Sequence, residues 1–250
     1  MKIKNILYNG EVQLMFESFK HQYTDSLGSV PSVTTILKII NKPALINWAA
    51  NTAIDYVSLQ ITPGISYDEL QLQAIWEAGK KAHYQKKTDA GTIGSFLHKW
   101  IEQYIKGENP PMPVNEGLKN SVFKFLEWSE KNKVKFLVSE QMIFSRKLRY
   151  TGTLDFICKI GEDLYIGDLK TSSGIYNEMW LQTSAYRFAR EEEFPAEKYK
   201  GQLILRIGKE GDFEIVKVCE EEIYKKMLVG FLSALKLYQI TEELKEFKGV

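Results

Sequence analysis

The segment 152–170 constrains the fold most, because two stretches typical of β-strands flank a turn of only two residues. Glycine tolerates the positive φ that a tight hairpin turn requires, so Gly161-Glu162 predicts a β-hairpin. A turn of this length pairs Ile157 with Ile166, and apolar residues then match across the two strands. The sequence therefore predicts an antiparallel pair, 152–160 with 164–170, within a larger sheet.

The same register places Asp155 directly opposite Asp168. Side chains in that arrangement lie about 4.5–5.5 Å apart, so two carboxylates repel each other unless a cation lies between them. Lys170 projects to the same face as Asp168, because side chains alternate along a strand. Carboxylate oxygens favour Mg²⁺ or Mn²⁺, which polarises a phosphoryl oxygen and acidifies water. Asp155, Asp168 and Lys170 are therefore candidate catalytic residues, with Lys170 orienting the attacking water.

An acidic residue two positions before a lysine is by itself a weak signal, since the pattern also occurs at 243–245 and 246–248. Those occurrences fall in a charged segment of helical character. Asp168 to Lys170 instead lies in a predicted strand and follows the pattern Gly152-x-x-Asp155. The strand context favours the catalytic interpretation over a solvated surface triplet.

His98 and Glu140 are further candidates for the site. His98 lies on a predicted helix, about 93–106, whose apolar stripe faces inward. Glu140 shares a strand face with apolar residues in the stretch 136–144, where a carboxylate needs a partner. A helical histidine is more often a packing or surface residue than a ligand, and an exposed edge-strand glutamate is the alternative for Glu140.

A predicted helix at 178–191 follows the second strand of the hairpin. Gln182 and Tyr186 are one turn apart on it, so they present an amide and a phenol on the same face. These groups suit contact with a bound ligand, and amphipathic packing is the alternative.

Two basic clusters are candidates for contact with phosphates. Arg146, Lys147 and Arg149 precede the hairpin, and four lysines lie between residues 80 and 87. Clusters of this kind are usually solvated, so the pattern does not by itself establish nucleic-acid binding.

The pattern along the chain predicts an α/β fold with a central mixed sheet flanked by helices. Residues 1–90 are expected to form an N-terminal hairpin, with a turn at Asn9-Gly10, and a helical portion. Residues 91–250 are expected to form the core that carries the candidate site. Further helices are expected at 116–132 and 220–247, and further strands at 202–207 and 213–218.

Composition excludes several classes of protein. A net charge of +1 is no global signature of nucleic-acid affinity, so DNA contacts would depend on local patches. Two cysteines without a CxxC pair predict neither a disulfide framework nor a zinc ribbon. The absence of a long apolar run and of a signal-peptide pattern predicts a cytoplasmic protein without membrane contact.

Three patterns in order, G-x-x-D, D-x-K and Q-x-x-x-Y, resemble the RecB-like branch of the PD-(D/E)xK nuclease superfamily. The helical segment from Gly91 to His98 looks like the upstream histidine motif of that branch. Residues 30–36 are similar to openings in phage exonucleases and in the mitochondrial genome maintenance exonuclease. The resemblance covers about residues 30 to 190 and implies a restriction-endonuclease-like core.

The resemblance also implies roles for individual residues. The metal, Mg²⁺ or Mn²⁺, would be bound by His98, Asp155, Asp168 and the backbone carbonyl of Leu169, with Glu140 a further catalytic acid. Lys170 would assist the attacking water. The residues expected to serve DNA binding are Gln182, Tyr186, Arg146, Lys147 and Arg149.

The activity implied is hydrolysis of DNA from free ends of single strands, in a phage or in DNA repair. Two cysteines are too few for the four-cysteine iron–sulfur cluster of some relatives, and no GxxxxGK[ST] pattern is present. Unwinding would therefore come from a partner, such as a helicase, and a single-strand-binding or annealing protein is a further expected partner. A site-specific or structure-specific endonuclease and a non-catalytic DNA-binding subunit are the alternatives.

Overall fold

The computed structural model describes residues 2–208 and 211–247, and the chain forms two compact units. Unit 1 comprises residues 1–40 and 97–250, and unit 2 comprises residues 41–96. The first 40 residues therefore belong with the sheet that carries the candidate site. The domain boundary expected between residues 90 and 91 stays a prediction.

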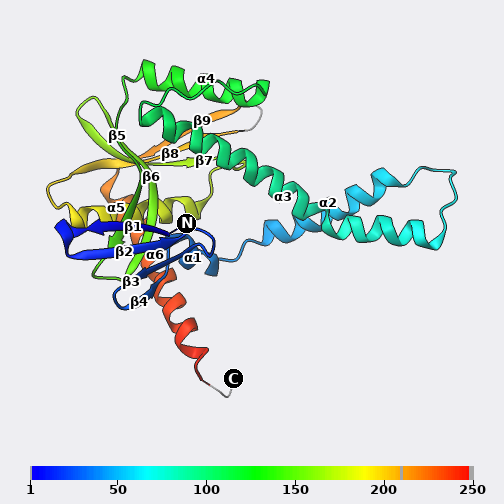
Figure 1. The fold of residues 1–250 in the computed structure, drawn as a ribbon, viewed down its shortest axis with the longest axis horizontal. Helices are drawn as coiled ribbons and strands as arrows, with labels where there is room; N and C mark the ends of the chain where they lie inside the picture. Colours follow the sequence, from blue (N-terminus) through cyan, green and yellow to red (C-terminus); the bar gives the residue numbers. More distant parts are fainter. Residues whose placement is uncertain (1, 209–210, 248–250) are drawn as a thin grey trace. The chain divides into compact units, whose positions relative to one another are not determined.

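Nine strands in the described residues form two sheets, both in unit 1 (Figure 1). The four-stranded sheet has the order β1-β2-β3-β4 and consists of β1 (Lys2–Leu7), β2 (Val12–Glu17), β3 (Gln22–Asp25) and β4 (Gly28–Val30). The five-stranded sheet has the order β5-β6-β7-β8-β9 and consists of β5 (Lys135–Ser145), β6 (Tyr150–Ile160), β7 (Asp163–Lys170), β8 (Tyr199–Ile207) and β9 (Phe213–Val218).

The described residues also form six α-helices and two short 3₁₀ helices. The α-helices are α1 (Val33–Ile36), α2 (Pro43–Gln60), α3 (Glu69–Ile105), α4 (Glu116–Lys131), α5 (Asn177–Glu193) and α6 (Glu221–Leu244). The 3₁₀ helices are η1 (Tyr8–Gly10) and η2 (Leu37–Ile39). None of these α-helices combines the length and the apolar character that a membrane crossing requires.

The five-stranded sheet is mixed, which confirms the predicted α/β fold with a central mixed sheet, while the restriction-endonuclease-like core stays a prediction. All neighbouring strands are antiparallel except β7 and β8, which are parallel and are joined through α5. A parallel pair needs such a crossover connection, and a helix that packs on the sheet supplies it. The predicted hairpin register is confirmed, since Ile157 pairs with Ile166 and Ile160 with Asp163.

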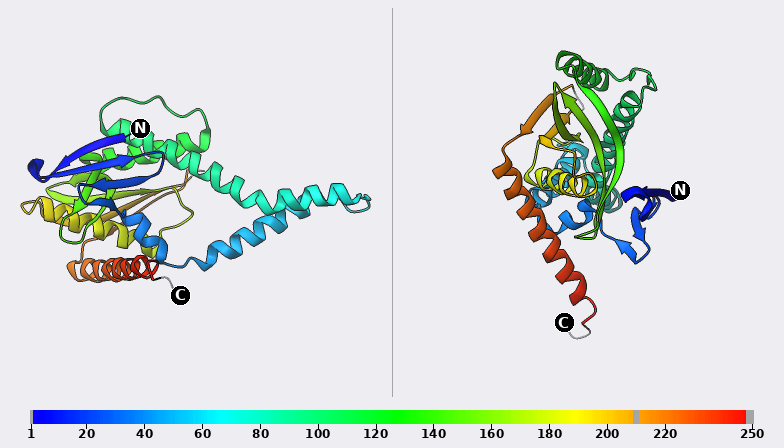
Figure 2. Two further views of the ribbon diagram at one scale, coloured as in Figure 1. Left: turned by 60° about the horizontal axis from the view of Figure 1, so that its bottom comes forward. Right: turned by 90° about the vertical axis from the view of Figure 1, so that its left-hand side faces the viewer.

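Helices cover both faces of this sheet. On one face, Ala185, Tyr186 and Ala189 of α5 join Leu154 and Ile166 of the sheet in a buried cluster, and α6 packs against α5 (Figure 2). On the other face, Tyr104 of α3 packs on Phe125 of α4, which packs on Phe136 of β5, and Phe136 packs on Phe156 of β6. The ring centroids of these successive pairs are 5.5, 5.9 and 5.5 Å apart. These two layers hold β6 and β7 in place between them.

The four-stranded sheet packs against β5 through apolar side chains. Leu14, Tyr23 and Val30 are buried together with Met142 and Phe144 of β5. The hairpin predicted at Asn9-Gly10 is present, with both residues at positive φ. The N-terminal strands therefore support the strand that carries Glu140.

Unit 2 is helical, as predicted, and consists of α2 and the first part of α3. A Cβ atom on Gly79 would lie 2.7 Å from a methyl group of Val57, so glycine allows α3 to approach α2 closely. The helix expected at about 93–106 is not separate, because α3 continues through Gly91 and Gly94 from Glu69 to Ile105. A Cβ on Gly91 would meet open space, so nothing near it interrupts the helix.

Candidate metal centre

Three acidic residues, Glu140 of β5, Asp155 of β6 and Asp168 of β7, lie at neighbouring positions of the sheet and are called the acidic row below. The pairs Ser139–Phe156 and Gln141–Leu154 bracket Glu140 and Asp155, so these two residues lie at the same level of the two strands. On the other side, the pairing of β6 with β7 ends at Phe156 and Gly167, and Asp155 and Asp168 are the next residues beyond that pair. The Asp155 carboxylate lies close enough to raise the pKa of Asp168. The hairpin turn therefore brings together carboxylates that the sequence separates.

Asp155 marks the point where β6 and β7 stop pairing through their backbones. The last pair of the two strands is Phe156 with Gly167, next to Asp155 in the chain. Beyond that pair, the Leu169 N–H donates to Asp155 Oδ2 at 2.6 Å. The carboxylate thereby takes the place of a backbone acceptor. This bond fixes the Asp155 side chain, while metal binding by the Leu169 carbonyl stays a prediction.

His98, Glu140 and Asp155 form a group that could hold a metal ion. One ligand atom of each lies within 4.8 Å of the others, and His98 Nδ1 is 3.8 Å from Asp155 Oδ1. Two carboxylates and an imidazole suit a divalent cation such as Mg²⁺ or Mn²⁺. The residues of unit 1 therefore fit the metal that the sequence predicts.

The electrostatics of Glu140 support the same conclusion. Burial raises the pKa of Glu140 to about 8, and the neighbouring Asp155, Glu102 and Asp168 carboxylates contribute in the same direction. Lys106 opposes these effects but does not overcome them. Since a cation beside Glu140 would favour its charged form, the cluster is better suited to holding a metal than to standing alone.

Glu140 also has an unusual backbone conformation. Its φ is 48°, in the left-handed region that residues with a side chain rarely adopt, although it lies inside β5. Such conformations cost about 1–3 kcal/mol and cluster at functional sites. The strained position coincides with the acidic row.

Asp168 is fully buried and belongs to a second group of polar side chains, in which Lys170 and Gln182 are half-buried. Lys170 Nζ lies 2.5 Å from Asp168 Oδ2 and donates to Gln182 Oε1 at 3.2 Å. Gln182 Nε2 donates to Asp168 Oδ1 at 3.0 Å and to the Tyr186 hydroxyl at 2.9 Å. These four residues are called the buried network below. Asp168 is turned towards it, and its predicted metal contact stays a prediction.

Charges in the buried network stabilise each other. Burial raises the pKa of Asp168, and Asp155 raises it further, while the Lys170 ammonium acts in the opposite direction. Burial would lower the pKa of Lys170, but Asp168 and Asp155 outweigh that effect and raise it. Lys170 therefore remains an ammonium near neutral pH and can donate hydrogen bonds, but cannot accept a proton.

Gly152 connects the first pattern of the predicted site with the last. A Cβ atom at Gly152 would lie 2.7 Å from Cε1 of Tyr186, so only glycine leaves room for the phenol ring beside β6. Tyr186 is 2% exposed, and its hydroxyl accepts the Gln182 amide. Gln182 and Tyr186 therefore orient the buried network, while contact of either with DNA stays a prediction.

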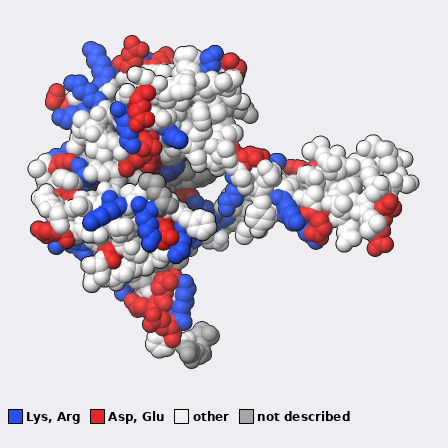
Figure 3. Space-filling view, in the orientation of Figure 1, with Lys and Arg blue, Asp and Glu red and all other residues white. Residues whose placement is uncertain are grey.

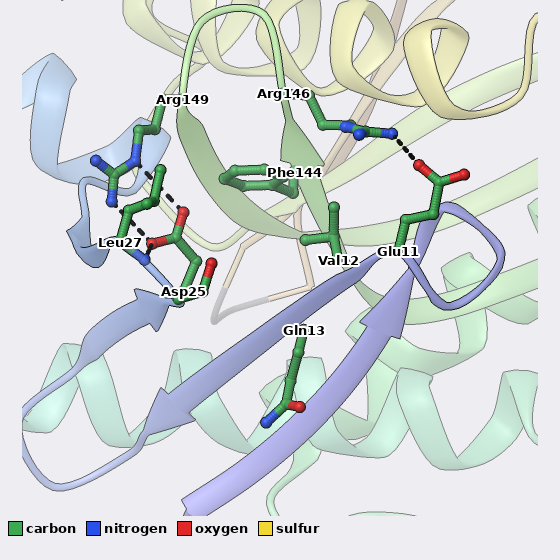
Figure 4. Close-up of a pocket in the computed structure, with 9 residues that line it drawn as sticks. Glu11, Val12, Gln13, Asp25, Leu27, Phe144, Arg146 and Arg149 are labelled. Carbon is green, nitrogen blue, oxygen red and sulfur yellow. Dashed lines mark hydrogen bonds and ion pairs between the residues drawn. The ribbon is translucent and has the colours of Figure 1, made fainter.

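The predicted basic cluster before the hairpin lies at the far end of β5 and β6. Arg146 donates to Glu11 at 2.7 Å, and Arg149 donates to Asp25 at 2.8 and 3.3 Å, on two sides of a pocket of about 210 Å³ (Figure 4). Lys147 is exposed. The turn is five positions from Glu140 and Asp155, which is roughly 17 Å along a strand. Both arginines are thus engaged within the protein, and their contact with DNA stays a prediction.

Two residues close to the acidic row have no role predicted from the sequence. Glu102 and Lys106 both act on the pKa of Glu140, and they form an ion pair with each other. Glu102 follows His98 by one helical turn, which was the available signal.

On the face shown in Figure 3, positive and negative side chains are interspersed, in keeping with the small net charge.

Neither a family model nor a curated protein matches the chain. A crystal structure of a "Putative exonuclease" from Eubacterium rectale is similar, with a TM-score of 0.37 and 11% sequence identity. The alignment covers 58% of this chain and 68% of that chain. This similarity is too low to assign the chain to a family.

Proposed function

We propose that this chain is a metal-dependent nuclease of the PD-(D/E)xK type that hydrolyses DNA from free ends of single strands. One observation carries the proposal: His98, Glu140 and Asp155 offer ligand atoms within 4.8 Å of one another, and Asp155 acts on the charge of the neighbouring pair, Asp168 and Lys170. Phosphoryl transfer needs positioning and charge neutralisation more than covalent chemistry, and this arrangement offers both. The order of the three sequence patterns supports the nuclease type.

The metal would be held by His98, Glu140 and Asp155, with Asp168 and the Leu169 carbonyl as proposed further ligands. A divalent cation there would neutralise charge on a phosphoryl oxygen and lower the pKa of water. Asp155 is held in place by the Leu169 N–H, so its remaining oxygen is oriented before substrate binds.

Lys170 would orient the attacking water and stabilise negative charge on the phosphate. It remains an ammonium because Asp168 and Asp155 raise its pKa, so it acts as a hydrogen-bond donor. Gln182 holds both members of the pair through its two ends. Tyr186 would support the reaction by fixing Gln182 and so acts as a positioning residue.

The test is degradation of end-labelled single-stranded and duplex DNA in Mg²⁺, in Mn²⁺ or with a chelator. We expect metal-dependent loss of linear single strands, with circular single strands intact, and the position of the label reveals the polarity. Cleavage of circles would instead indicate an endonuclease. Lys170→Ala should abolish turnover, and DNA binding without cleavage by the unaltered protein would favour a non-catalytic subunit.

A further inference from the structure

Unit 2 presents an aromatic and basic face that the candidate metal centre does not use. Trp76, Lys80, His83, Tyr84 and Lys87 recur at intervals of three or four residues along α3, so they share one side of the helix. Trp76 and Tyr84 are 53% and 63% exposed. These residues are called the aromatic–lysine face below.

The charge on and beside this face is positive, and most of it is unpaired. No acidic residue occurs between Glu77 and Asp89, while that stretch contains Lys80, Lys81, Lys86 and Lys87. Lys80 pairs with Glu77 at 2.5 Å. Among the described residues, no ion pair involves Lys81, Lys86 or Lys87, which are all exposed. Three ammonium groups therefore remain for an anionic partner.

The packing of α2 against α3 keeps the rings in place. Gly79 lets the helices approach, and beside it Trp76 and Lys80 line an apolar groove with Ile54 and Val57. The groove has a volume of about 370 Å³. The ring centroid of His83 lies 6.4 Å from that of Trp48 and 4.1 Å from that of Tyr84. Trp76 beside the groove and Tyr84 beside His83 are therefore held on the surface of unit 2 by neighbouring side chains.

We infer that the aromatic–lysine face binds single-stranded DNA, with Trp76 and Tyr84 stacking on bases and Lys87 of the face, together with the neighbouring Lys86, contacting phosphates. Exposed rings beside lysines are the combination that binds single strands, because every base has a flat face and every linkage a negative charge. A protein partner would match the apolar groove but not the run of four lysines. The inference rests on the proposed function only for the choice of DNA as ligand.

The test is equilibrium binding of a labelled oligothymidylate to the full-length protein in chelator, where cleavage does not interfere. Tyr84→Ala and Trp76→Ala should each weaken binding roughly 5- to 100-fold, the range for loss of one stacked base. Tyr84→Phe and Trp76→Phe keep a ring and should bind nearly as the unaltered protein does. Phe19→Ala is the matched control, because Phe19 is 93% exposed on the β2–β3 turn of unit 1.

The lysines are tested by charge reversal and salt titration. Lys86→Glu with Lys87→Glu should weaken binding and lower the slope of log affinity against log salt by roughly 0.7 for each phosphate that the protein no longer neutralises. Lys226→Glu with Lys236→Glu, both exposed on α6, is the control. Unchanged thermal unfolding of each variant excludes loss of folding as the cause.

The outcomes separate this inference from the proposed function. Binding that depends on the aromatic–lysine face in a protein without nuclease activity would support the inference and refute the function. Nuclease activity with binding unaffected by the four substitutions would overturn the inference alone. Loss of a homodimer on substitution of Trp76, with DNA binding unchanged, would also overturn it and identify the groove as a self-association surface.

Discussion

The buried network of unit 1 and the aromatic–lysine face of unit 2 present similar kinds of side chain in opposite settings. Asp168 is fully buried, and Lys170, Gln182 and Tyr186 bond to one another around it. On α3, by contrast, Tyr84 and Lys87 are exposed.

This difference between a buried and an exposed setting predicts where single substitutions should have large effects. Groups in one buried network depend on each other, since removing one partner leaves the other desolvated and unpaired. Exposed groups without shared partners act almost independently, and their contributions add. We therefore expect steep, coupled effects in the buried network and graded ones on the aromatic–lysine face.

The largest expected effect follows from Asp168→Asn. The change removes the charge that holds Lys170 and should lower DNA cleavage by about 10²- to 10³-fold or more. Asp163→Asn makes the same change at an exposed position of the same hairpin and should leave the rate unaltered. Single-turnover cleavage measures both, and similar rates for the two variants would break the comparison between buried and exposed acids.

Glu140→Gln should change how stability depends on pH in metal-free protein. Burial, reinforced by Asp155, raises the pKa of Glu140 from 4.5 to about 8, so the folded state retains a proton that the unfolded state releases. The stability contributed by Glu140 is therefore fully present below pH 4.5 and is lost as the pH rises through about 8. Urea unfolding across this range in chelator should show a loss of on the order of a few kcal/mol that the variant lacks.

A saturating divalent metal should offset that loss in the unaltered protein, because it stabilises the ionised carboxylate. Glu162→Gln, at the exposed hairpin turn, serves as control. Identical pH profiles for the unaltered protein and Glu140→Gln would show that the pKa of Glu140 is not raised in the folded protein.

Gly152→Ala should destabilise the fold by about 1–3 kcal/mol, because the added methyl group overlaps Tyr186. The double variant with Tyr186→Leu should lose less than the sum of the single changes, since the ring is then gone. Gly91→Ala is the contrasting change, because a methyl group there meets open space on a helix and should stabilise by up to about 1 kcal/mol. Additive costs at 152 and 186 would argue against the contact.

The smallest expected effect is that of Arg146→Ala. Its ion pair with Glu11 is exposed, with 47% and 65% of the two side chains accessible, and exposed pairs contribute about 0–1 kcal/mol. Unfolding free energy and DNA affinity should both change little. A large loss of DNA affinity would show that Arg146 leaves Glu11 to bind phosphates. It would also show that exposure of a charged side chain determines its effect more than its ion pair does.

Local sequence patterns predicted the hairpin well. Gly161 and the apolar residues of its two strands determine the register, and Ile157 pairs with Ile166 as expected. Ser32 also caps α1, because its side chain accepts the Thr35 N–H, and a serine ahead of an apolar run is a local signal of this kind. Such features depend on neighbours in the chain, which a single sequence contains.

Features that depend on distant segments were not predictable in the same way. The positive φ of Glu140 arises inside a strand and has no turn residue to signal it. The pairing of Arg149 with Asp25 joins segments 124 positions apart, so the sequence alone presented Arg149 as a free basic residue. The contact between Gly152 and Tyr186 requires the sheet and α5 to be in place together.

The carboxylate of Asp155 serves the sheet and the candidate metal centre at once. Oδ2 holds the Leu169 N–H, while Oδ1 faces His98. Any cation drawn to Oδ1 therefore polarises the acceptor of one particular backbone amide. The Leu169 amide is accordingly a built-in spectroscopic reporter, whose NMR frequency and hydrogen-exchange rate should follow occupancy of the site without any label.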